Sequence, residues 1–582
     1  MKLFTRNNTS LILFAIFLTA YSIIRLCGNG GLQKVIRSDA SGYYAYLPAL
    51  FVFNDPSFSA AEQAEQINNE SRPGNLYLYV DEHGERYNKY FPGIAVLQAP
   101  FFAIGHLFSI LPGAEANGYT FWYTFWYFVG SLCYVLLGLF YFSRLIKRLY
   151  PAVVPKLRGL LPLVYLSTPL LHYSVENVGF SHLYSFFLFV LFGNLVLDVL
   201  DGSAKKSTVV FLGLVFGLIL LVRPTNAAII LSIPLLAGSW EQTKHFFRKI
   251  VHPLGPLLIA VFVLCLVLFI QPAIWKWETG NWIVWSYSGE GFNFLSPHLA
   301  EVFFSFRIGL FLHHPIFILV VLSCIFLFKE RRFFAIAWGI YFLINFWIIS
   351  AWWCWDYESP FGVRPIVEHL PFLLLPLLAE AQRWRRSAGI FIVLISILAI
   401  IRHGQYISGS MTVQRYTAAS YFKSLAFWQA SNFNRWNYTL SCPPHGNRIK
   451  TDWLFAEKEE QRISKEVEFC CVGELILDSL RLHERYYFGV DLEKKVGKFP
   501  FDDVFLVLDA SDSRSDQRYY ATLKLYNDRF EGGDDWVKLR FEGMLHDQLR
   551  QFEKVKIYIW NRNPNPFSLR NVEIKLETYK DE

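Results

Sequence analysis

The chain has 582 residues, of which 53% are hydrophobic and 18% aromatic, while only 18% are charged. This composition is too apolar for a water-soluble protein of three or four ordinary domains. Residues 1–440 contain 32 Lys and Arg against 21 Asp and Glu, whereas residues 441–582 contain 23 and 27. The sequence therefore predicts a membrane domain followed by a small water-soluble one. The basic residues are dispersed among apolar segments, which excludes nucleic acid as a partner.

The N-terminus carries two basic residues before an apolar run, but no small-residue cleavage site follows Leu26. We expect a retained first transmembrane helix rather than a cleaved signal peptide. The 8 cysteines show no paired spacing, so they imply neither a disulfide framework nor a metal cluster.

Eleven apolar runs approach the roughly 20 residues that a membrane-spanning helix needs. They lie at 9–27, 118–143, 159–175, 180–200, 207–222, 225–240, 252–271, 308–328, 333–350, 366–382 and 388–402. Of the 32 basic residues before position 441, 18 lie in segments on one side of these spans. The positive-inside rule makes that side cytoplasmic. The C-terminal domain and four segments, 28–117, 172–180, 272–307 and 351–365, are then expected on the outer face.

The apolar stretch 92–111 is predicted to be an interfacial or re-entrant helix on the outer face. Counting it as a span would place the five cations of 144–158 outside, against the charge rule.

Acidic residues are scarce in the membrane part, yet the first outer loop carries Asp39 about a dozen residues after the first span. A carboxylate at the lipid–water boundary gains basicity from the low dielectric, which suits a general base. Capping of a helix N-terminus is an alternative role for this residue. The following Tyr43 and Tyr44 are candidate substrate-lining residues.

Lys89 stands directly before the predicted interfacial helix, where an ammonium and backbone N–H groups can hold a phosphate together. A lysine that only anchors the helix at the interface is the alternative. Arg223, Arg307 and Arg364 are further outer-face cations. Charges at the membrane edge are costly and usually face a cavity or a partner, so these residues either build an anion site or pair with nearby carboxylates.

The outer turn around Glu176 and His182 is rich in groups that titrate or donate hydrogen bonds. It predicts either a structural hydrogen-bond network or a second acid–base or metal site. Trp-rich outer loops contain Glu290, Trp355 and Asp356. These loops are typical of an interfacial aromatic belt, and the alternative is stacking against a carbohydrate.

Four segments in this order resemble motifs of the polytopic GT-C glycosyltransferases, and together they extend over about residues 1–400. They are residues 38–44 (SDASGYY), 89–93 (KYFPG), 223–226 (RPTN) and 359–364 (SPFGVR). Within that class the chain is most similar to bacterial relatives of the protein O-mannosyltransferase and lipid A aminoarabinose transferase group. Where the family more often has Lys-Pro-Pro, this chain has Lys-Tyr-Phe-Pro.

The resemblance implies an inverting transfer from a polyprenyl-phosphate-linked sugar donor to a periplasmic glycan, lipid or protein acceptor. Asp39 matches the family's loop Asp that acts as base or positions the acceptor, and Lys89 matches the family's lysine that contacts the lipid phosphate. Arg223, Arg307 or Arg364 would assist Lys89 there. Many relatives carry a second acidic residue where this chain has Ala40, so a divalent metal is not implied and no other cofactor is expected.

The C-terminal segment changes to a period of two, as in Val555, Ile557 and Ile559, which predicts strands. We expect a GT-C-like transmembrane domain at 1–402, with the outer loop 28–117 inside it. An amphipathic connector at 403–440 and a jelly-roll-like periplasmic β-sandwich at 441–582 follow. The predicted location is the bacterial inner membrane, with the N-terminus in the cytoplasm. A transporter or lipid flippase is the alternative function, and a polysaccharide polymerase or ligase would share the same chemistry.

Overall fold

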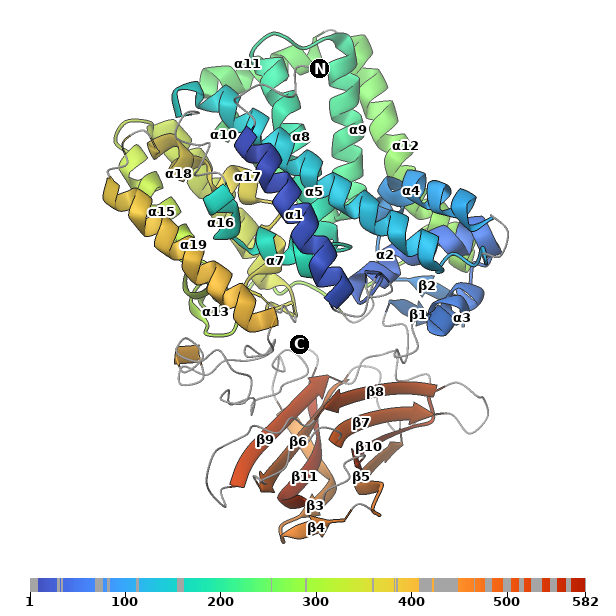
Figure 1. The fold of residues 1–582 in the computed structure, drawn as a ribbon. Coiled ribbons are helices and arrows are strands. Elements are labelled where there is room, and N and C mark those ends of the chain that lie inside the picture. The colour runs from blue at the N-terminus through green and yellow to red at the C-terminus, as the bar shows by residue number, and fades with distance from the viewer. Residues whose placement is uncertain are drawn as a thin grey trace.

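The computed structural model comprises a helical part and a C-terminal β part (Figure 1). The residues that it describes are 9–28, 32, 35–68, 77–80, 84–110, 115–153, 162–252, 254–287, 290–357, 361–381, 383, 386–407, 421–422, 448–464, 466–476, 484–495, 504–511, 518–524, 536–544, 552–561 and 567–580.

The helical part begins with a long helix and a set of short elements that belong to the first predicted outer loop. These are α1 (Thr9–Gly28), α2 (Asp39–Pro48), the π-helical η3 (Ala49–Phe53), α3 (Ser59–Asn68), β1 (Leu78–Val80), β2 (Arg86–Asn88) and α4 (Gly93–Ser109). The next helices are α5 (Phe121–Leu149), η4 (Pro151–Val153), α7 (Pro169–Glu176), α8 (Ser181–Leu200), α9 (Lys206–Val222), η5 (Pro224–Leu231), α10 (Ser232–Ala237), α11 (Trp240–Val251) and α12 (Leu254–Thr279). The last are α13 (Leu299–Phe304), α14 (Leu310–His313), α15 (Ile316–Leu327), α16 (Arg332–Ala351), η6 (Arg364–Ile366), α17 (Leu370–Leu373), α18 (Leu375–Glu380) and α19 (Arg386–Ile407).

Five helices within the described residues are long and apolar enough to cross a membrane, judged by length and composition. They are α5, α8, α12, α16 and residues 389–406 of α19, and they coincide with five of the eleven predicted spans. The chain thus has the helices of a multi-pass membrane protein, and the total of eleven spans stays a prediction.

Several other predicted spans are divided into shorter helices, and prolines lie at or near the starts of these helices. The run 225–240 divides into η5 and α10, 308–328 into α14 and α15, and 366–382 into η6, α17 and α18. A proline lacks the N–H that an α-helix needs and clashes with the preceding turn. Pro224, Pro315 and Pro371 lie at the first or second helical position or at the N-cap of their elements, where that loss costs least.

Close backbone approaches assemble the elements that line the cavity described below. α4 packs against α5 and α2, and α9 lies between α8 and α12. A Cβ on Gly93, at the start of α4, would lie 2.4 Å from the backbone nitrogen of Val222, so only glycine allows this contact. The contact places the end of the Lys89 turn against the end of α9, where Arg223 follows.

The C-terminal β part consists of two antiparallel sheets. One has the order β5-β10-β7-β8, and the other has the order β3-β11-β6-β9 with β4 also paired to β11. The strands are β3 (Arg448–Glu457), β4 (Gln461–Ile463), β5 (Phe469–Ile476), β6 (Glu484–Lys495), β7 (Val504–Ser511), β8 (Arg518–Lys524), β9 (Trp536–Met544), β10 (Lys554–Asn561) and β11 (Phe567–Lys580).

Apolar side chains from both sheets share one core, which includes Phe488, Leu506, Ile557 and Ile574. The predicted alternation is present in β10, where Val555, Ile557 and Ile559 are buried. Figure 1 shows the two sheets beyond the end of the helical part that carries α2, α3, β1 and β2. Of the connector predicted at 403–440, all but residues 403–407 and 421–422 lies outside the described residues.

Candidate functional site

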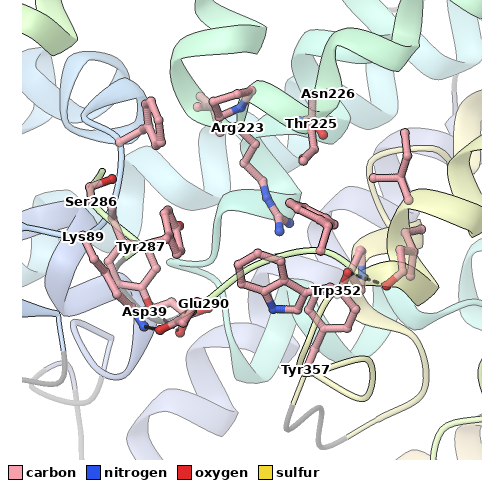
Figure 2. Close-up of a pocket in the computed structure, with 18 of the residues that line it drawn as sticks. Asp39, Lys89, Arg223, Thr225, Asn226, Ser286, Tyr287, Glu290, Trp352 and Tyr357 are labelled. Carbon is pink, nitrogen blue, oxygen red and sulfur yellow. Dashed lines mark hydrogen bonds and ion pairs between the residues drawn. The ribbon is translucent and has the colours of Figure 1, made fainter. Parts of the chain in front are cut away.

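A cavity of ≈ 330 Å³ opens among segments that are far apart in the sequence (Figure 2). Its walls come from the start of α2, the turn before α4, the start of α8, the turn between α9 and η5, the loop after α12, the end of α16 and η6 with the residues after it. Asp39, Lys89, Arg223 and Arg364 all lie on the lining, together with Tyr43, His182 and Glu290.

Asp39 is the first residue of α2 and is not the cap of that helix. Ser38 occupies the N-cap position, and no side chain makes a capping hydrogen bond there. The Asp39 Oδ2 atom lies 3.1 Å from Arg364 Nη2, and Oδ1 accepts a hydrogen bond of 2.9 Å from the Tyr90 hydroxyl. Burial by itself would raise the pKa of this carboxyl, but Arg364, Lys89, the hydrogen bond from Tyr90 and His182 together lower the pKa below its ordinary value. The gain in basicity expected from the sequence is therefore wrong for the empty cavity, because neighbouring positive charge opposes the effect of burial.

Lys89 follows β2 directly, and its backbone N–H donates to Tyr77 O at 2.9 Å. Its Nζ lies 3.0 Å from Glu290 Oε1 and over the rings of Tyr79, Tyr90 and Tyr287, at 5.3 to 5.9 Å from their centroids. Glu290 also accepts hydrogen bonds from the Tyr79 hydroxyl at 2.8 Å and from the indole N–H of Trp353 at 3.3 Å. The ammonium is therefore held at the cavity wall by one carboxylate and three aromatic faces.

Arg223 enters the cavity from the turn between α9 and η5, opposite Lys89 and Glu290 (Figure 2). Its Nη1 lies 3.0 Å from His182 Nδ1 and 3.4 Å from Glu368 Oε1. His182 Nδ1 in turn lies 2.6 Å from Glu368 Oε2, with both side chains 2% exposed. A second polar cluster thus stands across the cavity from Lys89.

Each of the three cations on the lining has a carboxylate partner, in the pairs Lys89–Glu290, Arg223–Glu368 and Arg364–Asp39. An anion that enters the cavity therefore competes with these carboxylates for the cations. Such an anion gains strong charge-assisted hydrogen bonds because the site is shielded from bulk water. The arrangement can bind a phosphate, and doing so releases carboxylates from their partners.

Aromatic rings form much of the remaining wall, among them Trp275, Trp285, Tyr287, Trp352 and Tyr357. Thr225, Asn226, Ser286 and Asn345 add polar groups between them. Ring faces interleaved with hydrogen-bonding groups suit a ligand that has apolar C–H faces and hydroxyl edges, as a sugar ring has.

Five residues predicted as candidates lie elsewhere, where they have structural partners. Tyr44 is buried outside the lining and donates its hydroxyl to Gly118 O. Glu176 binds Arg25, with Arg25 Nε 2.7 Å from Oε1 and Nη2 3.2 Å from Oε2, and its side chain is 3% exposed. Arg307 pairs with Asp356 and lies over the Trp355 ring. Because buried charges need partners, these ion pairs stabilise the fold, and their side chains lie outside the cavity where a ligand would bind.

Glu368, Tyr90, Trp352 and His369 line the cavity but were not proposed as site residues. A signal existed for Glu368 and His369, because two polar residues at the start of an otherwise apolar run indicate a functional cavity or an ion pair. For Trp352 the signal was its position in a Trp-rich outer loop, where stacking against a carbohydrate was one interpretation. Tyr90 lies in the KYFPG segment, but nothing distinguished it from the many other tyrosines of this chain. Within the described residues, no group of three or more His, Cys, Asp or Glu side chains could hold a metal ion.

Comparison with solved structures finds two proteins to which the fold of this chain is similar. The chain is similar to ArnT from Cupriavidus metallidurans, in the apo state and bound to undecaprenyl phosphate, each with a TM-score of 0.44 and 12% identity. The match with the lipid-bound form covers 73% of this chain and 70% of that chain. The arabinosyltransferase EmbB from Mycobacterium smegmatis gives a TM-score of 0.35 at 12% identity, over 97% of this chain and 64% of that chain.

No protein-family model matches the sequence, and no curated protein matches it. TM-scores below 0.5 at this identity do not establish function, so the chemistry of the cavity has to be argued from its own residues.

Proposed function

We propose that this protein is an inverting membrane glycosyltransferase that moves a sugar from a polyprenyl-phosphate donor to an acceptor hydroxyl. The observation that carries the proposal is the meeting of Asp39 with the cations Lys89, Arg223 and Arg364 in one aromatic-lined cavity, within a part rich in apolar helices. A base, an anion site and sugar-stacking rings are the three components that this reaction needs.

In the proposed reaction, the acceptor oxygen attacks the anomeric carbon from the face opposite the phosphate. The new bond joins this oxygen to the sugar, while the bond between the anomeric carbon and the phosphate oxygen breaks with its electron pair. The acceptor proton moves to Asp39, and the lipid leaves as a polyprenyl phosphate. No nucleotide takes part in this step.

Lys89 and the two arginines support departure of the lipid phosphate. As negative charge develops on the leaving oxygen, these cations stabilise it more strongly than they stabilise the bound donor, which lowers the barrier. Their carboxylate partners keep the empty cavity close to neutral, with three cations facing three carboxylates. This balance avoids the cost of burying unpaired positive charge before the donor arrives.

The donor phosphate is expected at the outer leaflet of a bacterial inner membrane, with the N-terminus in the cytoplasm and the β part in the periplasm. The acceptor is a periplasmic glycan, lipid or protein hydroxyl. The eighteen cations on the predicted inner side support this orientation, and an outer β part would lie where acceptors are.

The test uses the full-length protein in detergent or nanodiscs and a panel of polyprenyl-phosphate sugars, with release of polyprenyl phosphate as the readout. Wild type should turn over at least one donor, and Asp39→Asn should lower this turnover at least a hundredfold. The matched control is Asp201→Asn, because Asp201 is an exposed carboxylate that pairs with Arg148 at 2.8 Å, away from the cavity. Equal turnover by wild type and Asp39→Asn would reject Asp39 as the base. Binding without turnover of any donor would favour a transporter or flippase.

A further inference from the structure

Tyr90 lies between the two residues that the proposed reaction depends on most. Its hydroxyl donates to Asp39 Oδ1 at 2.9 Å, and its ring lies 5.3 Å from the Lys89 ammonium, measured to the ring centroid.

The backbone of Tyr90 is held on both sides by buried side chains. Its N–H donates to Asn88 Oδ1 at 3.0 Å, and its carbonyl accepts a hydrogen bond from the Tyr46 hydroxyl. Asn88 and Tyr46 are both fully buried. The Asn88 amide also donates to Gly42 O at 2.8 Å, which links the Lys89 turn to α2. These bonds leave the main chain at Tyr90 little freedom to move relative to Asp39.

The ring of Tyr90 occupies space on α2 that only a glycine leaves open. A Cβ on Gly42 would lie 2.3 Å from Tyr90 Cδ2 and 2.7 Å from Tyr77 Cβ. Gly42 follows Asp39 by three residues, so the two share one face of the helix. The phenol is thus seated against the same helix face that presents the carboxylate.

The groups that face Asp39 come from several elements. They are Arg364 from η6, Lys89 and Tyr90 from the turn before α4, His182 from α8, Tyr43 from α2 and Tyr287 from the loop after α12. Among the described residues, Arg364 and Tyr90 contact the carboxylate oxygens directly, and each engages a different oxygen.

We propose that Tyr90 is a positioning residue that fixes the orientation of the Asp39 carboxylate for proton transfer. The proposal rests on the proposed function. The Tyr90 hydroxyl keeps its hydrogen bond to Asp39 Oδ1 throughout the reaction, while the Arg364 guanidinium moves from Asp39 Oδ2 to the donor phosphate. Oδ2 then accepts the proton of the acceptor hydroxyl, and the phenol keeps its own proton.

The direct test is Tyr90→Phe, which removes the hydroxyl and keeps the ring. We expect kcat with the donor that wild type turns over to fall about tenfold, with the KM for the donor and the melting temperature unchanged. A hydrogen bond to the ionised carboxylate lowers its pKa, so its loss should move the acidic limb of the pH–kcat profile upward by about one unit. A residue that only supports the fold would not move this limb.

Tyr134→Phe is the matched control, because the Tyr134 hydroxyl donates to Leu97 O at 2.7 Å and lies outside the cavity lining. It should leave kcat and the acidic limb unchanged. An unchanged kcat and limb in Tyr90→Phe would overturn the positioning role. If Asp39→Asn also retained full turnover, Asp39 would be rejected as the base, whereas the proposed function itself would fail if wild type bound donors without turning over any of them. The failure of the positioning role and the failure of the proposed function are therefore distinguishable.

Discussion

Replacing Glu290 by Gln should tighten the binding of a lipid phosphate, whereas replacing Lys89 by Ala should weaken it. Lys89 Nζ lies 3.0 Å from Glu290 Oε1, and the two side chains are 15% and 7% exposed. A phosphate that binds Lys89 has to draw the ammonium away from this carboxylate. Glutamine is nearly isosteric with glutamate and carries no charge, so it removes the competitor while keeping an oxygen for the Tyr79 hydroxyl.

The size of each effect follows from the pair's surroundings. Exposed ion pairs contribute up to about 1 kcal/mol, and this pair is mostly buried but shares Glu290 with two other donors. Taking about 1 kcal/mol for the competition, affinity should rise about fivefold in Glu290→Gln. A hydrogen bond from an ammonium to a phosphate contributes about 1.5–3 kcal/mol, so Lys89→Ala should lower affinity roughly ten- to a hundredfold.

The assay is calorimetric titration of the detergent-solubilised protein with undecaprenyl phosphate. The Glu290→Gln gain should disappear in the double variant with Lys89→Ala, because both substitutions act through one ammonium. Glu474→Gln is the matched control, since Glu474 lies in the β part and forms exposed pairs with Lys554 and Lys556. Weaker binding by Glu290→Gln, or a gain that persists without Lys89, would refute the competition between carboxylate and phosphate.

Three further outcomes follow from other contacts. Glu176→Gln should lower the free energy of unfolding by about 3 kcal/mol, because it breaks the buried ion pair with Arg25. The affinity for undecaprenyl phosphate should stay unchanged. Thermal melting measures the stability, and calorimetric titration measures the affinity. Gly42→Ala should lower the melting temperature, because overpacking against Tyr90 costs about 1–3 kcal/mol. This cost exceeds the gain of about 0.5–1 kcal/mol from removing a helical glycine. A higher melting temperature would contradict the close contact between Gly42 and Tyr90. Burial alone would raise the pKa of Asp39, but Arg364, Lys89, Tyr90 and His182 together lower it, so the ionised form stabilises the fold above pH ~4 and this stability is lost as the pH falls through the folded pKa. The melting temperature below pH ~4 should therefore fall more steeply in wild type than in Asp39→Asn.

The helices could be located from the sequence where apolar runs were long and had no proline beyond the first turn of the helix, although α12 also continues past the end of its run through Pro272. Five predicted spans coincide with helices of sufficient length, including α8 and α12. The runs that broke into short pieces, such as 308–328, contain prolines whose missing N–H ends a helix locally. Hydropathy averages over such breaks, so it could predict an apolar segment without predicting whether that segment forms one continuous helix.

The sequence could predict that the C-terminal part consists of strands, but it could not predict which strands pair with each other. Alternation in Val555, Ile557 and Ile559 marks a strand with one buried face, because successive side chains point to opposite faces. The pairing of β10 with both β5 and β7 joins residues far apart in the chain. Local alternation contains no information on that partner.

The sequence by itself determined that Asp39, Lys89, Arg223 and Arg364 stand out, because a charge in an apolar setting costs free energy and needs a compensating partner. Only the tertiary structure decided which partner each charge has. It placed Arg364 on Asp39 and Arg223 on Glu368, and it removed Glu176 and Arg307 from the cavity through ion pairs of their own. The energy of an ion pair depends on distance and burial, and for partners that lie far apart in the sequence these are set by the packing of helices rather than by spacing along the chain.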